Sequence, residues 1–400
     1  MKWEKKKIED ICLNITSGGT PKSTNEAFYN PQEIPWLKTG EVNYCRIYDT
    51  EKYISKEGLY NSSAKIIPTN SVIVAMYGQG DTAGRVAINK IPLTTNQACC
   101  NLIINDKVAD YEFVYYKLST LYEKMVSLKN GGAQPNLNVK IIKSIEISLP
   151  PLPVQQCIAS ILSAYDDLIE NNQKQIKLLE EAAQRLYKEW FVDLRFPGHE
   201  NVKIVDGVPE GWESCKLRDV AEINGRNIDE NYPYDKINYI DIGSVRNGRI
   251  LEKANYNLEE APGRAKRIVQ DGDVIWGMVR PNLRAYAMVL NPDKNDVFST
   301  GFAVLTSKKV PFSFLYCNVT TEEFVGYLVN CTNGAAYPAV KPIHFEEYNV
   351  SIPQNNLLNK FHNITEPYFR KIYYLNKQIS SLREARDRLL PKLMSGEIEV

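Results

Sequence analysis

An internal repeat is the feature of this sequence that most restricts its fold. The run Asn130-Gly131-Gly132-Ala133-Gln134-Pro135 aligns with Asn333-Gly334-Ala335-Ala336-Tyr337-Pro338, 203 positions later. The alignment continues without a gap to Leu186 in the first copy and Leu389 in the second. A period this long excludes a solenoid of short repeats. The chain therefore holds two copies of one plan, each a globular domain with the segment that follows it.

A second match lies near the beginning of each copy. Trp3-Glu4 aligns with Trp212-Glu213 at an offset of 209 positions, so the first copy carries six extra residues between the two matched regions. Between these regions the two sequences differ. Shared ends with different middles predict a common scaffold that presents two different surfaces.

The last part of each copy has the pattern of a coiled-coil helix. Apolar residues recur at alternating spacings of four and three, which is typical of a seam between two helices. The first seam comprises Ile158, Leu162, Tyr165, Ile169, Asn172, Ile176, Leu179, Ala183, Leu186 and Trp190. The second comprises Phe361, Thr365, Tyr368, Ile372, Leu375, Ile379, Leu382, Arg386 and Leu389. Asn172 is the strongly polar member of the first seam, and a buried Asn can fix the register.

Two equivalent helices in one chain can bury each other's seams. We expect them to pair antiparallel with pseudo-twofold symmetry; the alternative is that each helix packs on its own domain. Pro367 lies inside the second run and predicts that its first turns are kinked or separate. Gly198 and Gly396 follow the two segments and predict where the helices stop.

The globular parts mix short strand-like runs with helices and lack a steady strand-helix-strand alternation, which favours the α+β class. Strands are expected over 71–77, 85–88, 99–104, 273–279, 285–290 and 301–305, and helices over 111–129 and 312–328. We place the first globular domain at 1–152, the first long helix at 153–197, the second domain at 198–353 and the second helix at 354–400.

Composition excludes several classes of protein. Hydrophobic residues make up 44% and charged residues 24% of the chain, as in ordinary globular proteins. No uncharged run is long enough to cross a membrane, and the N-terminus has no apolar signal segment, so we expect a cytoplasmic protein. Eight cysteines without a C-x-x-C pair and only three histidines predict reduced thiols and no metal site.

Catalytic motifs are missing from the sequence. It has no phosphate-binding G-x-x-x-x-G-K-[ST] loop, no G-x-S-x-G turn and no H-E-x-x-H pair. The Asn/Asp-Pro-Pro-aromatic element expected of an amino-methyltransferase is also missing. We therefore expect a non-enzymatic chain without a cofactor. Because 48 basic residues balance 48 acidic ones, only a local basic face could attract nucleic acid.

The densest basic stretch lies in the second copy. The run Val279-Arg280-Pro281-Asn282-Leu283-Arg284 follows an expected strand and should form a loop at a sheet edge. Arg pairs with guanine edges and Asn with adenine edges, although a solvated turn with surface charges is the other interpretation. The DNA-binding candidates in this copy are Arg226, Arg264, Lys266, Arg280, Asn282, Arg284, Ser299, Thr300 and Tyr337.

The first copy offers polar loops instead. Thr16-Ser17-Gly18-Gly19-Thr20-Pro21-Lys22 carries small donors and a glycine pair that could approach phosphates closely. Side-chain amides in later loops could read adenine. Trp36 is more simply interpreted as a core aromatic residue. The DNA-binding candidates in this copy are Ser17, Gly18, Gly19, Thr20, Lys22, Lys38, Gln79, Thr82, Arg85, Gln97, Gln134 and Asn136.

Taken together, these motifs resemble those of one protein family over nearly the whole chain: the DNA-specificity subunits of Type I restriction-modification systems. The motifs that carry the resemblance are 34–41, 95–98, 131–136 and 149–156 in the first copy and 264–269, 272–274, 279–283 and 298–304 in the second. The second copy departs from the pattern at Gly334-Ala335-Ala336-Tyr337, where the first has Gly131-Gly132-Ala133-Gln134.

The resemblance implies two target-recognition domains that each read one half of a split double-stranded DNA site. It also implies that the paired helices set the spacing between half-sites and dock two methyltransferase subunits, which nuclease/translocase subunits join. Adenine methylation from S-adenosylmethionine and ATP-driven cleavage would then belong to those partners. The alternative is a non-catalytic scaffold whose duplicated domains bind protein and not DNA, and steep weakening by salt would distinguish DNA binding.

Overall fold

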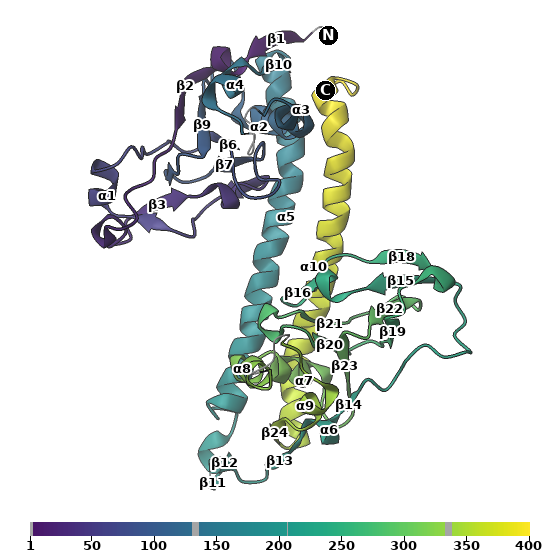
Figure 1. Ribbon diagram of the computed structural model, residues 1–400. Coiled ribbons are helices and arrows are strands. Elements are labelled where there is room, and N and C mark those ends of the chain that lie inside the picture. Colours follow the sequence, from purple (N-terminus) through teal and green to yellow (C-terminus); the bar gives the residue numbers. More distant parts are fainter. Residues whose placement is uncertain (1–2, 130–135, 206, 333–337) are drawn as a thin grey trace. The chain divides into compact units, whose positions relative to one another are not determined.

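The computed structural model describes residues 3–129, 136–205, 207–332 and 338–400 (Figure 1). The chain forms two compact units, the first made of Met1–Glu170 with Ile379–Val400 and the second of Asn171–Gln378. Each unit combines a mixed sheet-and-helix domain with parts of two long helices, α5 (Leu152–Tyr187) and α10 (Asn355–Ser395). The predicted α+β class is confirmed. The predicted domain limits remain an interpretation, since the units divide within both long helices.

The first unit is built on two sheets. The larger has the strand order β2-β9-β6-β7-β4 and the smaller β5-β3-β8. Their strands are β2 (Cys12–Ser17), β3 (Ile34–Leu37), β4 (Cys45–Ile47), β5 (Tyr53–Ile54), β6 (Val72–Ala75), β7 (Val86–Asn89), β8 (Thr94–Thr95) and β9 (Cys99–Ile104). Every residue of β6 and β7 is buried, which explains why these strands are apolar except for Asn89 at the end of β7.

Helices and a terminal strand pair complete the first unit. They are α1 (Lys56–Tyr60), α2 (Tyr111–Ser119), α3 (Tyr122–Ser127), α4 (Val139–Ser144) and the antiparallel pair of β1 (Glu4–Lys7) with β10 (Glu146–Leu149). The carboxylate of Asp110 caps α2 by accepting from the Phe113 amide at 2.9 Å. Phe113 and its buried neighbours on α2 pack in the same core as Ile158 and Leu162 of α5.

The second unit repeats most of this topology, without a counterpart of β4 in the first of its sheets and with one more strand, β19, in the other. Its sheets have the orders β14-β23-β20-β21 and β18-β15-β22-β19. The strands are β14 (Ala221–Ile223), β15 (Lys236–Ile240), β18 (Ala254–Asn257), β19 (Ala265–Ile268), β20 (Val274–Gly277), β21 (Tyr286–Met288), β22 (Asp296–Ser299) and β23 (Phe302–Ser307). β15 runs parallel to β22 and antiparallel to β18, as β3 does to β8 and β5. The two divergent middles therefore share a strand arrangement and differ in sequence and loops.

The rest of the second unit also has counterparts in the first. Its further elements are α6 (Leu217–Val220), α7 (Phe312–Val319), α8 (Glu322–Asn330), α9 (Pro342–Glu346) and the pair β13 (Glu213–Lys216) with β24 (Asn349–Ile352). Two short hairpins, β11 (Ile204–Val205) with β12 (Val208–Pro209) and β16 (Val245–Arg246) with β17 (Arg249–Ile250), are additional. Trp276 is fully buried at the centre of the core and donates through Nε1 to the Val319 carbonyl at 2.9 Å.

The predicted helix seam is confirmed within each unit. In the first unit Asp166 of α5 contacts Arg386 of α10, and in the second the Tyr187 ring packs against Phe361. Within the second unit Asn172 of α5 also contacts Gln378 of α10, so residue numbers rise along α5 from Asn172 to Tyr187 while their partners on α10 fall, which defines an antiparallel pair. The seam residues buried on α5 are Ile158, Leu162, Ile169, Asn172, Ile176 and Ala183, and Trp190 is buried in the turn that follows. The seam residues also pack on the globular domain of their own unit. The alternative interpretation, in which each helix packs on its own domain, therefore accounts for part of their burial.

Three helix predictions are wrong in detail. α10 runs through Pro367 without a break; Pro367 and Asn363, whose carbonyl loses its helical donor, are both exposed, so water can replace that bond. The first long helix ends before Gly198, because Lys188–Val192 forms a π-turn and Leu194 has a left-handed φ of 58°. The stretch 312–328 is two helices, since the Thr321 side chain caps a new one.

Other sequence predictions are confirmed. The expected strands correspond to β6, β7, β9, β20, β21 and β23. The segment 111–129 contains α2 and α3, separated at Thr120 and Leu121. Gly396 directly follows α10 and has a φ of 77°, as expected for a glycine that ends a helix.

Candidate nucleic-acid interface

In each unit most of the predicted DNA-binding residues lie at the end of the central strands where β6 and β20 end, whereas Arg226 contacts Asp273 and Thr306 at the opposite end of β20 and β23. In the first unit the Met76 amide donates to the Ala98 carbonyl at 2.8 Å, and the Leu137 amide donates to the Met76 carbonyl at 3.0 Å. In the second unit Met278 donates to Gly301 at 2.9 Å, and Val340 donates to Met278 at 2.8 Å. The same two hydrogen bonds therefore join equivalent segments in both copies.

These segments define two loop clusters. The first loop cluster comprises residues 17–22, 76–85, 96–98 and 136–137, and the second comprises 224–227, 264–267, 278–284, 299–301 and 338–340. Gln134 and Tyr337, both predicted to bind DNA, lie outside the described residues. Lys38 lies beside the first cluster, with its Nζ 5.8 Å from the centre of the Trp36 ring. The remaining predicted residues all fall in the two clusters.

The glycine pair of the first loop cluster has a packing role. The Gly18 amide donates to the Cys99 carbonyl at 3.3 Å and the Gly19 amide to Thr95 at 2.9 Å. A Cβ on Gly18 would collide with the Thr95 carbonyl oxygen, and one on Gly19 with the Ala64 backbone. Both amides are therefore used within the domain, and close approach of this pair to phosphate stays a prediction.

Polar side chains connect the loops of the first cluster. The Thr20 hydroxyl donates to the Gln97 side-chain oxygen, and both residues are exposed, as are Ser17 and Lys22. Trp36 is buried and donates through Nε1 to the Gly19 carbonyl at 3.0 Å, which supports its interpretation as a core residue.

The β6–β7 turn supplies the rest of the first cluster. The Thr82 hydroxyl donates to the Gln79 carbonyl at 2.7 Å, and Arg85 donates to the Asn43 side chain at 3.0 Å. Thr82 is buried, which leaves Gln79 as the exposed candidate of the turn. Asn136 is half-buried where the chain returns to this cluster.

The second loop cluster carries the exposed cations. Thr300 donates its amide to the Arg264 carbonyl at 2.8 Å, which ties the start of β19 to the β22–β23 turn. The side chains of Arg264, Lys266 and Arg280 are exposed, and among the described residues none of them forms an ion pair. Three unpaired cations on linked loops make a local basic face on a chain of zero net charge.

Two of the predicted arginines already have acidic partners. Arg226 donates to Asp273 at 2.7 Å and to the Thr306 hydroxyl at 3.0 Å, and the Asp273 side chain is almost completely buried. Burial raises the pKa of Asp273, and the Arg226 guanidinium acts against this shift. Arg284 donates from both terminal nitrogens to Glu322, each at 2.6 Å. Because the Arg284–Glu322 pair is exposed it is weak, so Arg284 can exchange partners at less cost than Arg226.

The remaining predicted residues of the second cluster differ in how exposed their side chains are. Ser299 is buried and its hydroxyl accepts from the Gly301 amide at 3.1 Å, so it shapes the turn. Asn282 is exposed at the tip of the β20–β21 turn. Thr300 is half-buried.

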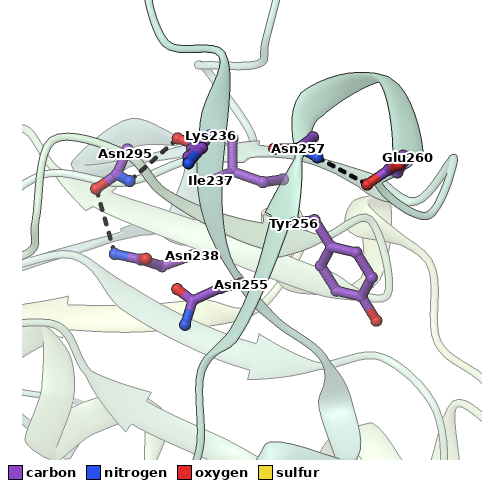
Figure 2. Close-up of a pocket in the computed structure, with 8 residues that line it drawn as sticks. All are labelled: Lys236, Ile237, Asn238, Asn255, Tyr256, Asn257, Glu260 and Asn295. Atoms are coloured by element: carbon purple, nitrogen blue, oxygen red, sulfur yellow. Dashed lines mark hydrogen bonds between the residues drawn. The ribbon is translucent and has the colours of Figure 1, made fainter.

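An amide-rich hollow of about 480 Å³ in the second unit was missed by sequence reasoning (Figure 2). It is lined by Lys236, Ile237, Asn238, Asn255, Tyr256, Asn257, Glu260 and Asn295. Figure 2 shows several of these groups bonded to one another: Asn238 donates to Asn295 at 3.2 Å, and Asn257 donates to Glu260 at 2.9 Å. The sequence has no clear motif for this hollow because its asparagines are far apart in the chain. Their hydrogen bonds to one another indicate a structural role.

The described residues show neither a metal-binding group nor a membrane-spanning helix. They contain no group of three or more His, Cys, Asp or Glu residues placed to hold a metal ion. None of the helices in those ranges is long and apolar enough to cross a membrane.

The duplicated α+β domains, the paired long helices and the equivalent loop clusters define a class of bipartite recognition proteins. The family described as "Type I restriction modification DNA specificity domain" matches this chain at residues 1–181 and again at 209–380. The chain belongs to this family. The two matched ranges coincide with the two copies found in the sequence.

Individual relatives agree with this assignment. The MjaIX specificity subunit of Methanocaldococcus jannaschii, a Type I restriction enzyme subunit, is 31% identical over 415 aligned positions, covering 100% of this chain and 94% of that protein. The MjaVIII specificity subunit of the same organism is 23% identical and covers 88% of this chain and 86% of its own length. The crystal structure of a Type I system S subunit from M. genitalium matches with a TM-score of 0.64 at 18% identity, over 98% of this chain and 96% of that one, which shows a shared fold.

Proposed function

We propose that this chain is the sequence-specific DNA-binding subunit of a Type I restriction-modification complex, with each unit reading one half of a bipartite target. The observation that carries the proposal is the pair of loop clusters. Equivalent backbone hydrogen bonds hold both, while their exposed side chains differ: amides and hydroxyls in the first, arginine, lysine and asparagine in the second. Two unlike readers on one repeated scaffold suit a target whose halves differ in sequence.

Within each half-site the residues divide by chemistry. Arg264 and Lys266 are suited to phosphate contacts, which set the position of the domain on DNA. Arg280 and Asn282 are suited to guanine and adenine edges. Because the whole chain carries 48 basic and 48 acidic residues, its own attraction for DNA is weak and partner subunits supply further phosphate contacts.

The long helices and the partners complete the proposal. The helix pair sets the distance between half-sites and docks two methyltransferase subunits, and nuclease/translocase subunits join that core. Methylation and cleavage belong to those partners, and the chain contributes no catalytic residue or cofactor. The complex acts in the cytoplasm, where the DNA is.

A map of methylated adenines tests the function directly. DNA is sequenced from cells that carry the neighbouring methyltransferase with this chain and without it. A gapped two-part motif that appears only with the chain is the expected result. Matched cells with Arg280→Ala should lose or change one part of the motif and keep the other. Absence of any chain-dependent motif, with salt-insensitive capture of a protein partner, would replace the proposal by the protein-scaffold alternative.

A further inference from the structure

The β20–β21 turn of the second unit presents one apolar side chain to solvent. Leu283 is 51% exposed, although it lies between the polar residues Asn282 and Arg284. Single exposed leucines are common on protein surfaces and need no explanation by themselves. Leu283 differs because of how firmly the turn is held and because of what surrounds it.

The backbone of this turn is fixed from several directions. Arg280 donates its amide to the Pro338 carbonyl at 2.8 Å, Leu283 donates to Arg280 at 2.8 Å, and Arg284 donates to Pro281 at 3.0 Å. The Asn247 amide reaches the Arg284 carbonyl at 2.9 Å from a neighbouring hairpin. These bonds prevent the turn from folding back to bury Leu283.

Backbone strain indicates that the shape of the turn matters. Arg280 and Arg284 have left-handed φ angles of 50° and 55°, which non-glycine residues adopt at a cost and mainly where function or packing requires it. At one end of the turn Arg284 also donates from both terminal nitrogens to Glu322, at 2.6 Å each. Pro281, which is buried, restricts the other.

The first unit shows that the fold does not need this apolar tip. Its equivalent turn, between β6 and β7, contains Gly78-Gln79-Gly80-Asp81-Thr82 and no exposed leucine. Gly80 has a left-handed φ of 59°, a conformation that glycine adopts readily, so this turn is built around a glycine and not around an apolar side chain. The same strand pair thus forms with a polar turn, and the leucine is specific to the second reader.

The neighbours of Leu283 indicate its ligand. Arg280 and Asn282, both exposed on the same turn, carry the groups that read guanine and adenine in the major groove. The apolar group displayed on base edges in that groove is the 5-methyl of thymine. We infer that Leu283 is a specificity-determining residue that contacts the methyl group of one thymine in the half-site read by the second unit. This inference rests on the proposed function and narrows it to one base.

Deoxyuridine substitution tests the contact, because deoxyuridine pairs as thymine does and lacks only the methyl group. The full chain is reconstituted with its methyltransferase subunits on a duplex that carries the mapped target. Each thymine of the second half-site is replaced in turn, and Kd is measured. One replacement should weaken binding about four-fold, the effect of losing one buried methyl group.

Leu283→Ala completes the test as a double-mutant cycle. The variant should bind the thymine duplex more weakly than the wild type, and the sensitive deoxyuridine should cost it nothing further. Leu13→Ala, at a 67% exposed leucine of the first unit, is the matched control and should keep the wild-type response. Thermal unfolding of both variants checks that they fold.

Failure of the inference can be told from failure of the proposed function. If the wild-type complex binds its target selectively while every deoxyuridine affects wild type and Leu283→Ala equally, the Leu283 assignment is wrong and the reader function stands. A wild-type complex without sequence-selective binding overturns both.

Discussion

The Arg386 guanidinium of α10 donates to the Asp166 carboxylate of α5 at 2.5 Å, and the Tyr116 hydroxyl donates to the other oxygen of the same carboxylate at 2.5 Å. Asp166 thus joins three helices of the first unit. Its side chain is only 12% exposed and that of Arg386 is 23% exposed, so solvent screens the pair incompletely. Arg386 occupies a seam position that the heptad pattern assigns to an apolar residue, and this carboxylate explains how it is accommodated.

Removing one partner of this pair should cost more than removing both. Asp166→Ala leaves the guanidinium and the Tyr116 hydroxyl without their acceptor and should lower the free energy of unfolding by about 2 to 3 kcal/mol. The double variant Asp166→Leu/Arg386→Leu should recover part of that loss. Denaturant unfolding of the three proteins measures the difference. A loss in the double variant equal to or larger than the loss in Asp166→Ala would mean that the unpaired guanidinium carries no penalty, which contradicts the prediction.

Substitutions in the second loop cluster should distinguish residues that contact bases from residues that stabilise the fold. Arg280→Ala should reduce methylation that depends on one half-site by about five-fold to 150-fold, since a bidentate base contact contributes about 1 to 3 kcal/mol. It should leave the melting temperature unchanged, because the side chain is exposed and unpaired among the described residues. Arg284→Ala should weaken recognition of the same half-site, because Arg284 would exchange Glu322 for a contact with DNA.

Arg226→Ala is the informative contrast. It leaves the buried Asp273 carboxylate without its guanidinium, so we expect a loss of stability of about 2 kcal/mol or more. A melting curve and a methylation map of the same variant distinguish the two roles. If the variant has normal stability and a changed methylation motif, Arg226 contacts DNA and does not have a structural role.

The ion pairs of Arg226 and Arg284 also show which features could not be predicted from the sequence, in contrast to the helix seam. Heptad spacing depends on neighbouring residues, and the seam from Ile158 to Trp190 is buried or half-buried as expected. The partner of Arg226 lies 47 positions away and that of Arg284 lies 38 positions away, so the ion pairs appear only once the sheets form. Two-residue strands such as β8 and β5 are too short to show a period. Their pairing in the smaller sheet therefore had no sequence signal.

Acidification should destabilise the second unit through His362. The ring contacts the Ser313 hydroxyl at 2.9 Å and the Glu366 carboxylate at 3.1 Å, and it packs against Phe312. Burial lowers its pKa from 6.5, outweighing the opposite effect of Glu366, and Arg370 lowers it further. The unfolded chain consequently binds a proton at a higher pH than the folded one.

The sign of this effect follows from linkage. Above pH 6.5 His362 is neutral in both the folded and the unfolded chain, so its titration does not change the free energy of unfolding. Below pH 6.5 the unfolded chain takes up the proton first. The free energy of unfolding therefore declines until the pH has passed the pKa of the folded state. Unfolding of wild type and His362→Gln between pH 5 and 7.5 measures the difference. The wild type should lose stability relative to the variant only below pH 6.5, and parallel curves would rule out His362 as the source.

Matched deletions in the two helices test their proposed role in spacing. Asn172 of α5 donates to the Gln378 side chain of α10 at 3.3 Å, so the register of the antiparallel pair is known at this point. Removing one heptad from each helix next to this contact preserves the seam and shortens the pair by about 10 Å. At 3.4 Å per base pair, the gap between the half-sites should shrink by about three base pairs. A heptad removed from α5 alone is the control, since it breaks the pairing with α10 and should abolish methylation. If the matched deletion methylates targets with the original gap, the helices do not set the spacing.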